Sequence, residues 1–280
     1  MIGPMNFLAR LQHAWQVQQS MLCVGLDPDP AKFPSALKAL ADRDRLAAIE
    51  QFCLGIMEAT APHACAFKPQ IAYFASSGAE SVLERLATVC RDRYPHHIWI
   101  LDAKRGDIGS TAEHYAKEAY DRYLADAVTV NPYMGTDSLA PYLRYESRGI
   151  FVLCRTSNPG GDDFQMLKTN HHALYIEVAR QAAQRWNQHQ QVGLVVGATY
   201  PREIESVRQV AKDLPLLIPG IGAQGGDLLA TVKAGKNAMG GMLINSSRAI
   251  IYASNGDDWK EKAAAVAQQT KNDINAACAS

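Results

Sequence analysis

Eight short apolar segments, separated by longer stretches with helical spacing, predict an α/β chain folded as a (β/α)8 barrel. Dividing 280 residues by eight gives 35 residues for each repeat, a normal length for one strand followed by one helix. Most of the segments are continuously apolar rather than alternating, as expected for parallel strands that are covered on both faces. An open, doubly wound sheet is the alternative arrangement of the same elements.

The predicted strands are spread along the whole chain. They are Met21–Leu26, Cys65–Phe67, Ile98–Leu101, Ala127–Val130, Ile150–Cys154, Val192–Val196, Leu216–Ile218 and Met242–Ile244. Between them, Arg45–Ala59 and Ser81–Val89 place their apolar residues on one helical face. These segments are therefore predicted to be helices that cover the outside of the sheet.

Two further helices are predicted from local signals. Ser110-Thr111-Ala112-Glu113 has the pattern of a capping box and predicts a helix that begins there and continues through Tyr123. Trp259–Ala277 is predicted to be a closing helix. Because no Gly/Ser-rich linker, composition shift or charge run divides the chain, we expect a single barrel domain over residues 1–280.

Composition excludes several classes of protein. Lys and Arg together number 28 and so do Asp and Glu, which leaves no excess of positive charge to attract nucleic acid. No apolar run approaches the roughly 18 residues of a membrane span, and the first residues lack the features of a secretory signal. The six cysteines are scattered without a C-x-x-C pair. We therefore expect a cytoplasmic protein with reduced, buried cysteines and with neither a membrane nor a nucleic-acid partner.

Charged residues follow the second and third predicted strands. Asp102 and Lys104 come directly after Ile98–Leu101 and lie two residues apart, so both side chains should leave the strand on the lumen side while Ala103 faces outward. Lys68 ends the neighbouring strand and should face Asp102. Catalytic residues of such barrels lie at the carboxyl ends of the strands. With Asp107, these residues predict an array of alternating charges in one pocket, with a structural ion pair at the strand end as the plainer interpretation.

A glycine-rich turn follows the seventh predicted strand. It runs from Gly220 to Gly226, and Arg248 follows the eighth strand. Loops after these two strands commonly bind phosphate in barrel enzymes, through backbone N–H groups and a charged side chain. A phosphate site is therefore predicted there. The sequence has no serine nucleophile elbow and no H-x-x-x-H spacing, so it offers little support for a hydrolase or a histidine metal site.

Taken together, the segments that follow the strands resemble the orotidine 5′-phosphate decarboxylase family, and within it the longer bacterial subgroup. The resemblance extends over nearly the whole chain and rests on these segments: Gly25-Leu26-Asp27-Pro28, Phe67-Lys68-Pro69-Gln70, Asp102-Ala103-Lys104-Arg105-Gly106-Asp107-Ile108-Gly109-Ser110-Thr111, Val130-Asn131-Pro132-Tyr133-Met134-Gly135, Arg155-Thr156-Ser157-Asn158-Pro159, Pro219-Gly220-Ile221-Gly222-Ala223-Gln224 and Asn245-Ser246-Ser247-Arg248-Ala249-Ile250.

The resemblance implies decarboxylation of orotidine 5′-monophosphate to UMP, the last step of de novo pyrimidine synthesis, without metal or organic cofactor. It also implies a homodimer in which each site combines residues of both subunits. The implied catalytic residues are Lys68, Asp102, Lys104, which protonates C6, and Asp107 from the partner. The implied substrate-binding residues are Asp27 and Thr111 for the ribose hydroxyls, Ser157 for the pyrimidine amide edge, and Gly222, Gln224 and Arg248 for the phosphate.

Other functions fit part of the pattern. A D-x-K-x-x-D motif also occurs in magnesium-dependent sugar-phosphate decarboxylases of the same barrel type, where the carboxylates bind the metal. A Schiff-base aldolase that uses Lys68 or Lys104 is a further alternative. A protein that binds a phosphate ligand without turning it over is the alternative from outside the enzymes.

Overall fold

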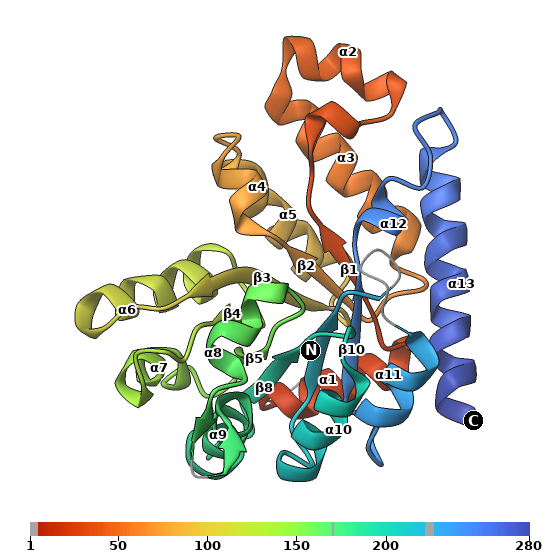
Figure 1. Ribbon diagram of the computed structural model, residues 1–280. Helices are drawn as coiled ribbons and strands as arrows, with labels where there is room; N and C mark the ends of the chain where they lie inside the picture. The colour runs from red at the N-terminus through yellow and green to blue at the C-terminus, as the bar shows by residue number, and fades with distance from the viewer. Residues whose placement is uncertain (1–4, 170, 222–226) are drawn as a thin grey trace.

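Eight parallel strands close into a barrel in the computed structural model, which describes residues 5–169, 171–221 and 227–280 (Figure 1). Their order around the barrel is β1-β10-β9-β8-β5-β4-β3-β2, so each strand lies beside the next one along the chain. The barrel closes where Leu22 of the first strand is in register with Ile244 of the last. This closure confirms the predicted (β/α)8 barrel and excludes the open, doubly wound sheet.

All eight predicted strands are present. Several continue beyond the apolar run into the polar residues that follow it, most clearly the third and the eighth. The barrel strands are β1 (Leu22–Leu26), β2 (Ala66–Pro69), β3 (Ile98–Arg105), β4 (Ala127–Val130), β5 (Gly149–Arg155), β8 (Val192–Val196), β9 (Leu216–Pro219) and β10 (Met242–Ser246).

Helices surround the strands on the outside (Figure 1). None of the helices in the described ranges is long and apolar enough to cross a bilayer. The helices are α1 (Phe7–Gln18), α2 (Ser35–Arg43), α3 (Arg45–Thr60), α4 (Ile71–Ala75), α5 (Glu80–Arg93), α6 (Gly109–Lys117), α7 (Thr136–Leu143), α8 (Asp162–Gln165), α9 (Leu174–Gln181), α10 (Pro201–Val210), α11 (Leu228–Gly235), α12 (Arg248–Ile251) and α13 (Trp259–Ala279).

The helices predicted from periodicity agree with α3 and α5, and the predicted closing helix agrees with α13, but the capping box was wrong. α6 begins at Gly109, and its N-cap is Ile108, without a side-chain hydrogen bond. Gly109 has a φ of +55°, a conformation that glycine adopts easily, and it turns the chain into the helix one residue early. The Ser110 hydroxyl therefore lies inside the first turn, where it cannot act as the cap. The helical path ends as predicted, in a π-helical turn over Glu118–Arg122 that is capped by Tyr123.

The unpredicted helix α1 closes the N-terminal end of the barrel. Phe7 and Leu11 are fully buried and pack with lumen-facing residues such as Phe151. The Phe7 and Phe151 rings meet edge to face with centroids 5.8 Å apart. A Cβ added at Gly149 would lie 2.3 Å from the Phe7 ring, so only glycine allows this approach. Side chains of α1 and of the strands thus fill the N-terminal end of the barrel.

A second unpredicted feature is the long connection between β5 and α9. It contains a 3-10 turn (Pro159–Gly161), the short helix α8, and a two-stranded hairpin formed by β6 (Lys168–Thr169) and β7 (His172–Ala173). This connection starts at the C-terminal end of β5, and its hairpin lies beside α9 (Figure 1). All six cysteines are free and five of them are buried, in agreement with their predicted packing role.

We expect Phe7→Ala to lower the free energy of unfolding by about 3–5 kcal/mol, because it removes a fully buried ring and leaves a cavity at the base of the barrel. Urea denaturation followed by circular dichroism measures the change. Val17→Ala on the same helix is the control, since Val17 is 47% exposed and should cost less than about 0.5 kcal/mol. Equal stability of the two variants would contradict the plug role of α1.

Candidate active site

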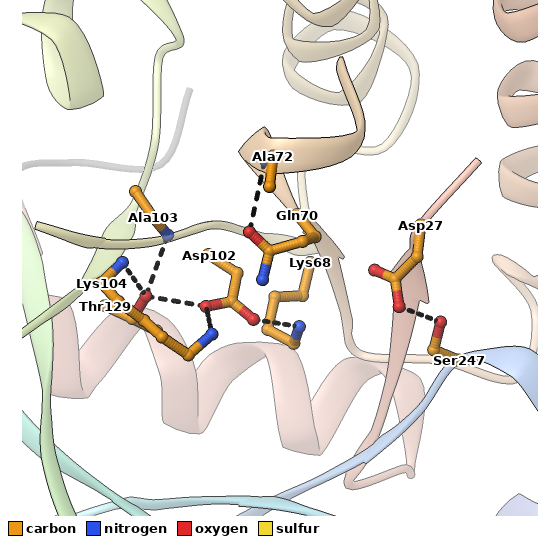
Figure 2. Close-up of polar contacts among 9 residues, drawn as sticks. All are labelled: Asp27, Lys68, Gln70, Ala72, Asp102, Ala103, Lys104, Thr129 and Ser247. Atoms are coloured by element: carbon orange, nitrogen blue, oxygen red, sulfur yellow. Dashed lines mark hydrogen bonds and ion pairs between the residues drawn. The ribbon is translucent and has the colours of Figure 1, made fainter. Parts of the chain in front are cut away.

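Three charged side chains meet at the C-terminal mouth of the barrel (Figure 2). The Lys68 ammonium at the end of β2 lies 2.7 Å from one oxygen of Asp102, and the Lys104 ammonium lies 2.7 Å from the other. The Lys68 and Asp102 side chains are 6% and 10% exposed, whereas that of Lys104 is 47% exposed. The structure therefore brings together the lysines and the aspartate that the sequence placed in one pocket.

Lys104 reaches this position through an irregular strand end rather than by simple alternation. The pairing of β3 with β4 shifts register between Leu101 and Arg105, and Lys104 has a φ of +48°. A left-handed conformation at a lysine costs of order 1–3 kcal/mol. Hydrogen bonds from the backbone N–H groups of Ala103 and Lys104 to Thr129 Oγ1, at 3.0 and 2.9 Å, stabilise the bend. The Asp102 and Lys104 side chains lie together, as predicted. The cause is the irregular end of β3 and not the regular alternation of side chains along a strand.

Thr129 is the functional residue that sequence reasoning missed. Its hydroxyl donates to Asp102 Oδ1 at 2.9 Å while it accepts the two backbone N–H groups (Figure 2). It thus orients the carboxylate and the lysine-bearing backbone at once. A signal existed in the sequence, because Thr129 is the polar residue within the otherwise apolar predicted strand Ala127–Val130.

The electrostatics favour charged forms for both members of the buried pair. Burial alone raises the pKa of Asp102, but the two ammonium groups reverse this and hold its pKa well below the ordinary value. Burial lowers the pKa of Lys68, and the carboxylates of Asp102 and Asp27 more than compensate, so its pKa is raised. Burial raises the pKa of the neighbouring Cys23 thiol to about 12, so this thiol adds no charge near neutral pH.

Asp27 forms the second acidic position of the mouth. Its Oδ2 accepts a hydrogen bond from Ser247 Oγ at 2.5 Å (Figure 2). Its Oδ1 is buried without a hydrogen-bond partner among the described residues, which leaves an acceptor for a ligand hydroxyl. Gly25 permits the arrangement, because a Cβ there would lie 2.7 Å from Ser247 Cβ. Gly25 is therefore a packing residue.

Two cavities meet at Lys68. Both are lined by Lys68 and Pro219, so they form one cleft. The smaller, of about 180 Å³, is lined by Asp27, Gly220, Ser247 and Arg248 among others. The larger, of about 400 Å³, is lined by Asp102, Lys104, Thr129, Leu153, Thr156, Ser157, Asn158, Val195 and Leu217 among others.

The two ends of the cleft differ in chemistry. The smaller end combines the exposed Arg248 with Gly220, a glycine whose φ is +100° in the turn after β9. These features suit an anionic group. The larger end has an apolar floor of Leu153, Val195 and Leu217 and a polar rim that includes Ser157. This end suits a flat, polar-edged ring.

Two further predicted site residues, Asp107 and Thr111, lie outside both cavities. Asp107 lines neither cavity, and its carboxylate accepts a hydrogen bond from the N–H of Ile108 at 2.8 Å. Thr111 is exposed on α6. Gly222 and Gln224 lie outside the described residues. Across the described ranges, no group of three or more His, Cys, Asp or Glu side chains is arranged to hold a metal ion.

Comparison with known proteins places this site in a family. Residues 20–264 match the model of the orotidine 5′-phosphate decarboxylase / HUMPS family. The chain belongs to this family. An orotidine 5′-phosphate decarboxylase of Bordetella avium is 60% identical over 275 residues, which cover 97% of this chain and 99% of the relative. One from Ralstonia nicotianae is 58% identical over 272 residues, or 97% and 98% of the two chains.

A solved structure of this family supports the same assignment at the level of coordinates. The OMP decarboxylase of Leishmania donovani superposes with a TM-score of 0.83 at 38% sequence identity, covering 99% of this chain and all of that one. Since the match extends over both chains, the two proteins share the barrel fold.

We expect the free energy of unfolding of Asp102→Asn to fall less steeply at acid pH than that of the wild type. The depressed pKa of Asp102 means that its ion pairs stabilise the fold fully above the ordinary pKa of 3.8 and lose this contribution as pH falls below it. The wild type should therefore lose more free energy of unfolding than the variant between about pH 5 and pH 2.5. Urea denaturation across this range measures the difference.

The control is Asp92→Asn, which removes an exposed carboxylate whose pKa is also lowered, by hydrogen bonding to Arg91. Solvent screening makes such pairs weak, so its profile should follow the wild type. At neutral pH, Asp102→Asn should be less stable than the wild type by roughly 3–5 kcal/mol, because Lys68 is left without its closest carboxylate. If the free energies of unfolding of Asp102→Asn and the wild type fall in parallel with decreasing pH, the Asp102 ion pairs do not stabilise the fold as described.

Proposed function

We propose that this protein removes carbon dioxide from orotidine 5′-monophosphate to give UMP, the last step of de novo pyrimidine synthesis, with Lys104 as the proton donor to C6. The observation that carries the proposal is the Lys68–Asp102–Lys104 group at the centre of a cleft with one anion-binding and one apolar end. It occurs in a chain that is 60% identical to an orotidine 5′-phosphate decarboxylase over nearly its full length.

The substrate spans the cleft in one orientation. Its phosphate lies against Arg248 and the turn that starts at Gly220, with Gly222 and Gln224 continuing that turn. The free oxygen of Asp27 accepts a ribose hydroxyl. The pyrimidine occupies the apolar end, where Ser157 meets its amide edge. This orientation places C6 and its carboxylate beside Asp102 and Lys104, between the two ends.

Decarboxylation breaks the bond between C6 and the carboxyl carbon and leaves an electron pair on C6. This pair lies in an sp² orbital in the ring plane, so the ring π system cannot delocalise it. A fixed ammonium beside C6 stabilises the developing negative charge. Lys104 then transfers a proton from Nζ to C6 and is reprotonated from water, which completes UMP and carbon dioxide. Asp102 holds both lysines and opposes the substrate carboxylate in the ground state.

This chemistry needs no metal or organic cofactor, because the lysines provide the positive charge. We propose that the enzyme works in this way. Phosphate binding, remote from the bond that breaks, supplies free energy for ordering the charged residues around the ring. Activity that persists in EDTA supports the cofactor-free reaction, and loss of activity in EDTA would favour the magnesium-dependent sugar-phosphate decarboxylase chemistry.

We further propose that the enzyme is a cytoplasmic homodimer, in which Asp107 and Thr111 complete the site of the partner subunit. Asp107 lies outside the cleft of its own chain. Large apolar side chains nearby are exposed: Ile108 is 54% exposed and Tyr133 is 82% exposed. The loops that carry them pack together, since a Cβ at Gly106 would lie 3.2 Å from Asn131 Cβ. Such a surface suits a second copy of the chain.

Lys104→Ala should lower the rate of decarboxylation at least about 10²–10⁴-fold, because it removes both the proton donor and the charge beside C6. The loss of ultraviolet absorbance on adding orotidine monophosphate to metal-free protein measures the rate. Binding of UMP, followed by calorimetry, should stay measurable. Lys233→Ala, an exposed lysine on α11, is the control and should keep wild-type activity. Near-normal turnover by Lys104→Ala would remove Lys104 from the mechanism.

Mixing Asp107→Ala chains with Lys104→Ala chains tests the shared site. Each variant alone should be inactive. After subunit exchange, half of the dimers are mixed and each mixed dimer has one intact site, so activity should recover to about one quarter of wild type. The same absorbance assay measures it. No recovery, in a sample shown by mass spectrometry to contain mixed dimers, would contradict a site shared between subunits.

A further inference from the structure

The segment that carries Ser157 is held from outside the cleft by Gln165. Gln165 Oε1 accepts a hydrogen bond from the backbone N–H of Thr156 at 2.9 Å, and its Nε2 donates to Thr156 Oγ1 at 2.8 Å. The Thr156 hydroxyl donates in turn to Asn158 Oδ1 at 2.7 Å. One amide side chain from α8 thus fixes the residues on both sides of Ser157.

The two hydrogen bonds between Gln165 and Thr156 form a clamp on this segment. A buried arginine, Arg155, anchors the clamp. The Arg155 side chain is 1% exposed and donates to Asp162 Oδ1 at 2.6 Å, which ties β5 to the first residue of α8. The Arg155 guanidinium lies 4.4 Å from the centre of the Tyr200 ring. A Cβ at Gly161 would lie 2.8 Å from Arg155 Nη1 and 3.0 Å from Gln165 Oε1. Glycine at this position therefore lets α8 approach closely enough for Gln165 to reach Thr156.

Gly197 also packs closely against Ser157. A Cβ at Gly197, just beyond β8, would lie 2.8 Å from Ser157 Cβ and 2.9 Å from its backbone nitrogen. The Ser157 backbone is thus packed against Gly197 and bounded by the clamped Thr156 and Asn158. In the described parts of the chain, no side-chain hydrogen bond of Ser157 is found, so its hydroxyl is available at the rim of the apolar end.

We propose that Gln165 is a positioning residue that sets recognition of the pyrimidine by holding Thr156-Ser157-Asn158 in its binding conformation. This inference rests on the proposed function, in which Ser157 meets the amide edge of the ring. Gln165 does not line the cleft beside the ring and acts through Thr156. A rigid recognition segment binds its ligand without the cost of ordering it, so loss of the clamp weakens binding of the base while the phosphate end is unaffected.

Gln165→Leu keeps an apolar side chain of similar volume, one atom shorter, and removes both hydrogen bonds to Thr156. Its affinity for UMP should fall about 10- to 100-fold, whereas its affinity for ribose 5-phosphate, which lacks the base, should stay within about twofold of wild type. Calorimetry with the two ligands measures this contrast. In turnover, KM for orotidine monophosphate should rise with little change in kcat, because the base edge is bound equally in ground and transition states.

Asp163→Ala, at an exposed neighbouring position of α8, is the matched control and should bind both ligands like the wild type. Thr156→Val tests the connection, since Gln165→Leu should cost less affinity in that background than in the wild type. Unchanged UMP affinity in Gln165→Leu, or an equal loss for UMP and ribose 5-phosphate, would overturn the proposal.

Amide hydrogen exchange separates this inference from the proposed function. The Thr156 N–H donates to Gln165, so the peptide that contains Thr156 should exchange faster in Gln165→Leu, with no ligand present. Faster exchange in a protein that never turns over orotidine monophosphate would support the clamp and contradict the decarboxylase. Unchanged exchange would contradict the clamp whatever the enzyme does.

Discussion

The whole site depends on one buried carboxylate that is held between two ammonium groups. Asp102 and Lys68 are nearly removed from water, and desolvating either charge alone would cost several kcal/mol. An opposite unit charge at about 4 Å recovers roughly 4 kcal/mol at an effective dielectric of 20, and Asp102 has two such partners at shorter distance. The Thr129 hydroxyl adds a hydrogen bond to the same carboxylate. The three charged side chains stabilise one another, and their geometry is therefore fixed before any ligand binds.

The barrel supplies the rigidity that this arrangement needs. Lys68 and Asp102 lie on paired strands, so their separation is set by the backbone ladder of a closed sheet. The base of the cylinder is filled by α1, and Phe7 occupies the space that Gly149 leaves open. At the mouth, Lys104 adopts a left-handed conformation that the Thr129 hydroxyl stabilises. In such barrels the N-terminal end provides stability, and strained backbone conformations occur at the C-terminal end, where the active site lies.

The cleft has two ends because different connections form them. The turns after β9 and β10 provide Gly220 and Arg248, whereas the segment after β5 provides Ser157. Behind the second end lies an additional layer, α8 with Gln165 and the buried Arg155, that fills no part of the cleft. Binding energy from both ends can therefore act on the charged residues between them, which lie beside the reacting carbon.

The sequence by itself predicted the barrel, its eight strands, and the gathering of Lys68, Asp102 and Lys104. These follow from hydrophobic periodicity and from the rule that parallel strands end at one face, both of which are local signals. The capping box at Ser110 failed because a neighbouring glycine turned the chain first. The sequence marks Thr129 only as a polar residue in a buried strand; its hydrogen bonds, the role of Gln165, the plug formed by α1 and the bend at Lys104 came from the tertiary structure. Each depends on contacts between residues that are far apart in the chain. A local sequence pattern does not specify which of these residues come into contact.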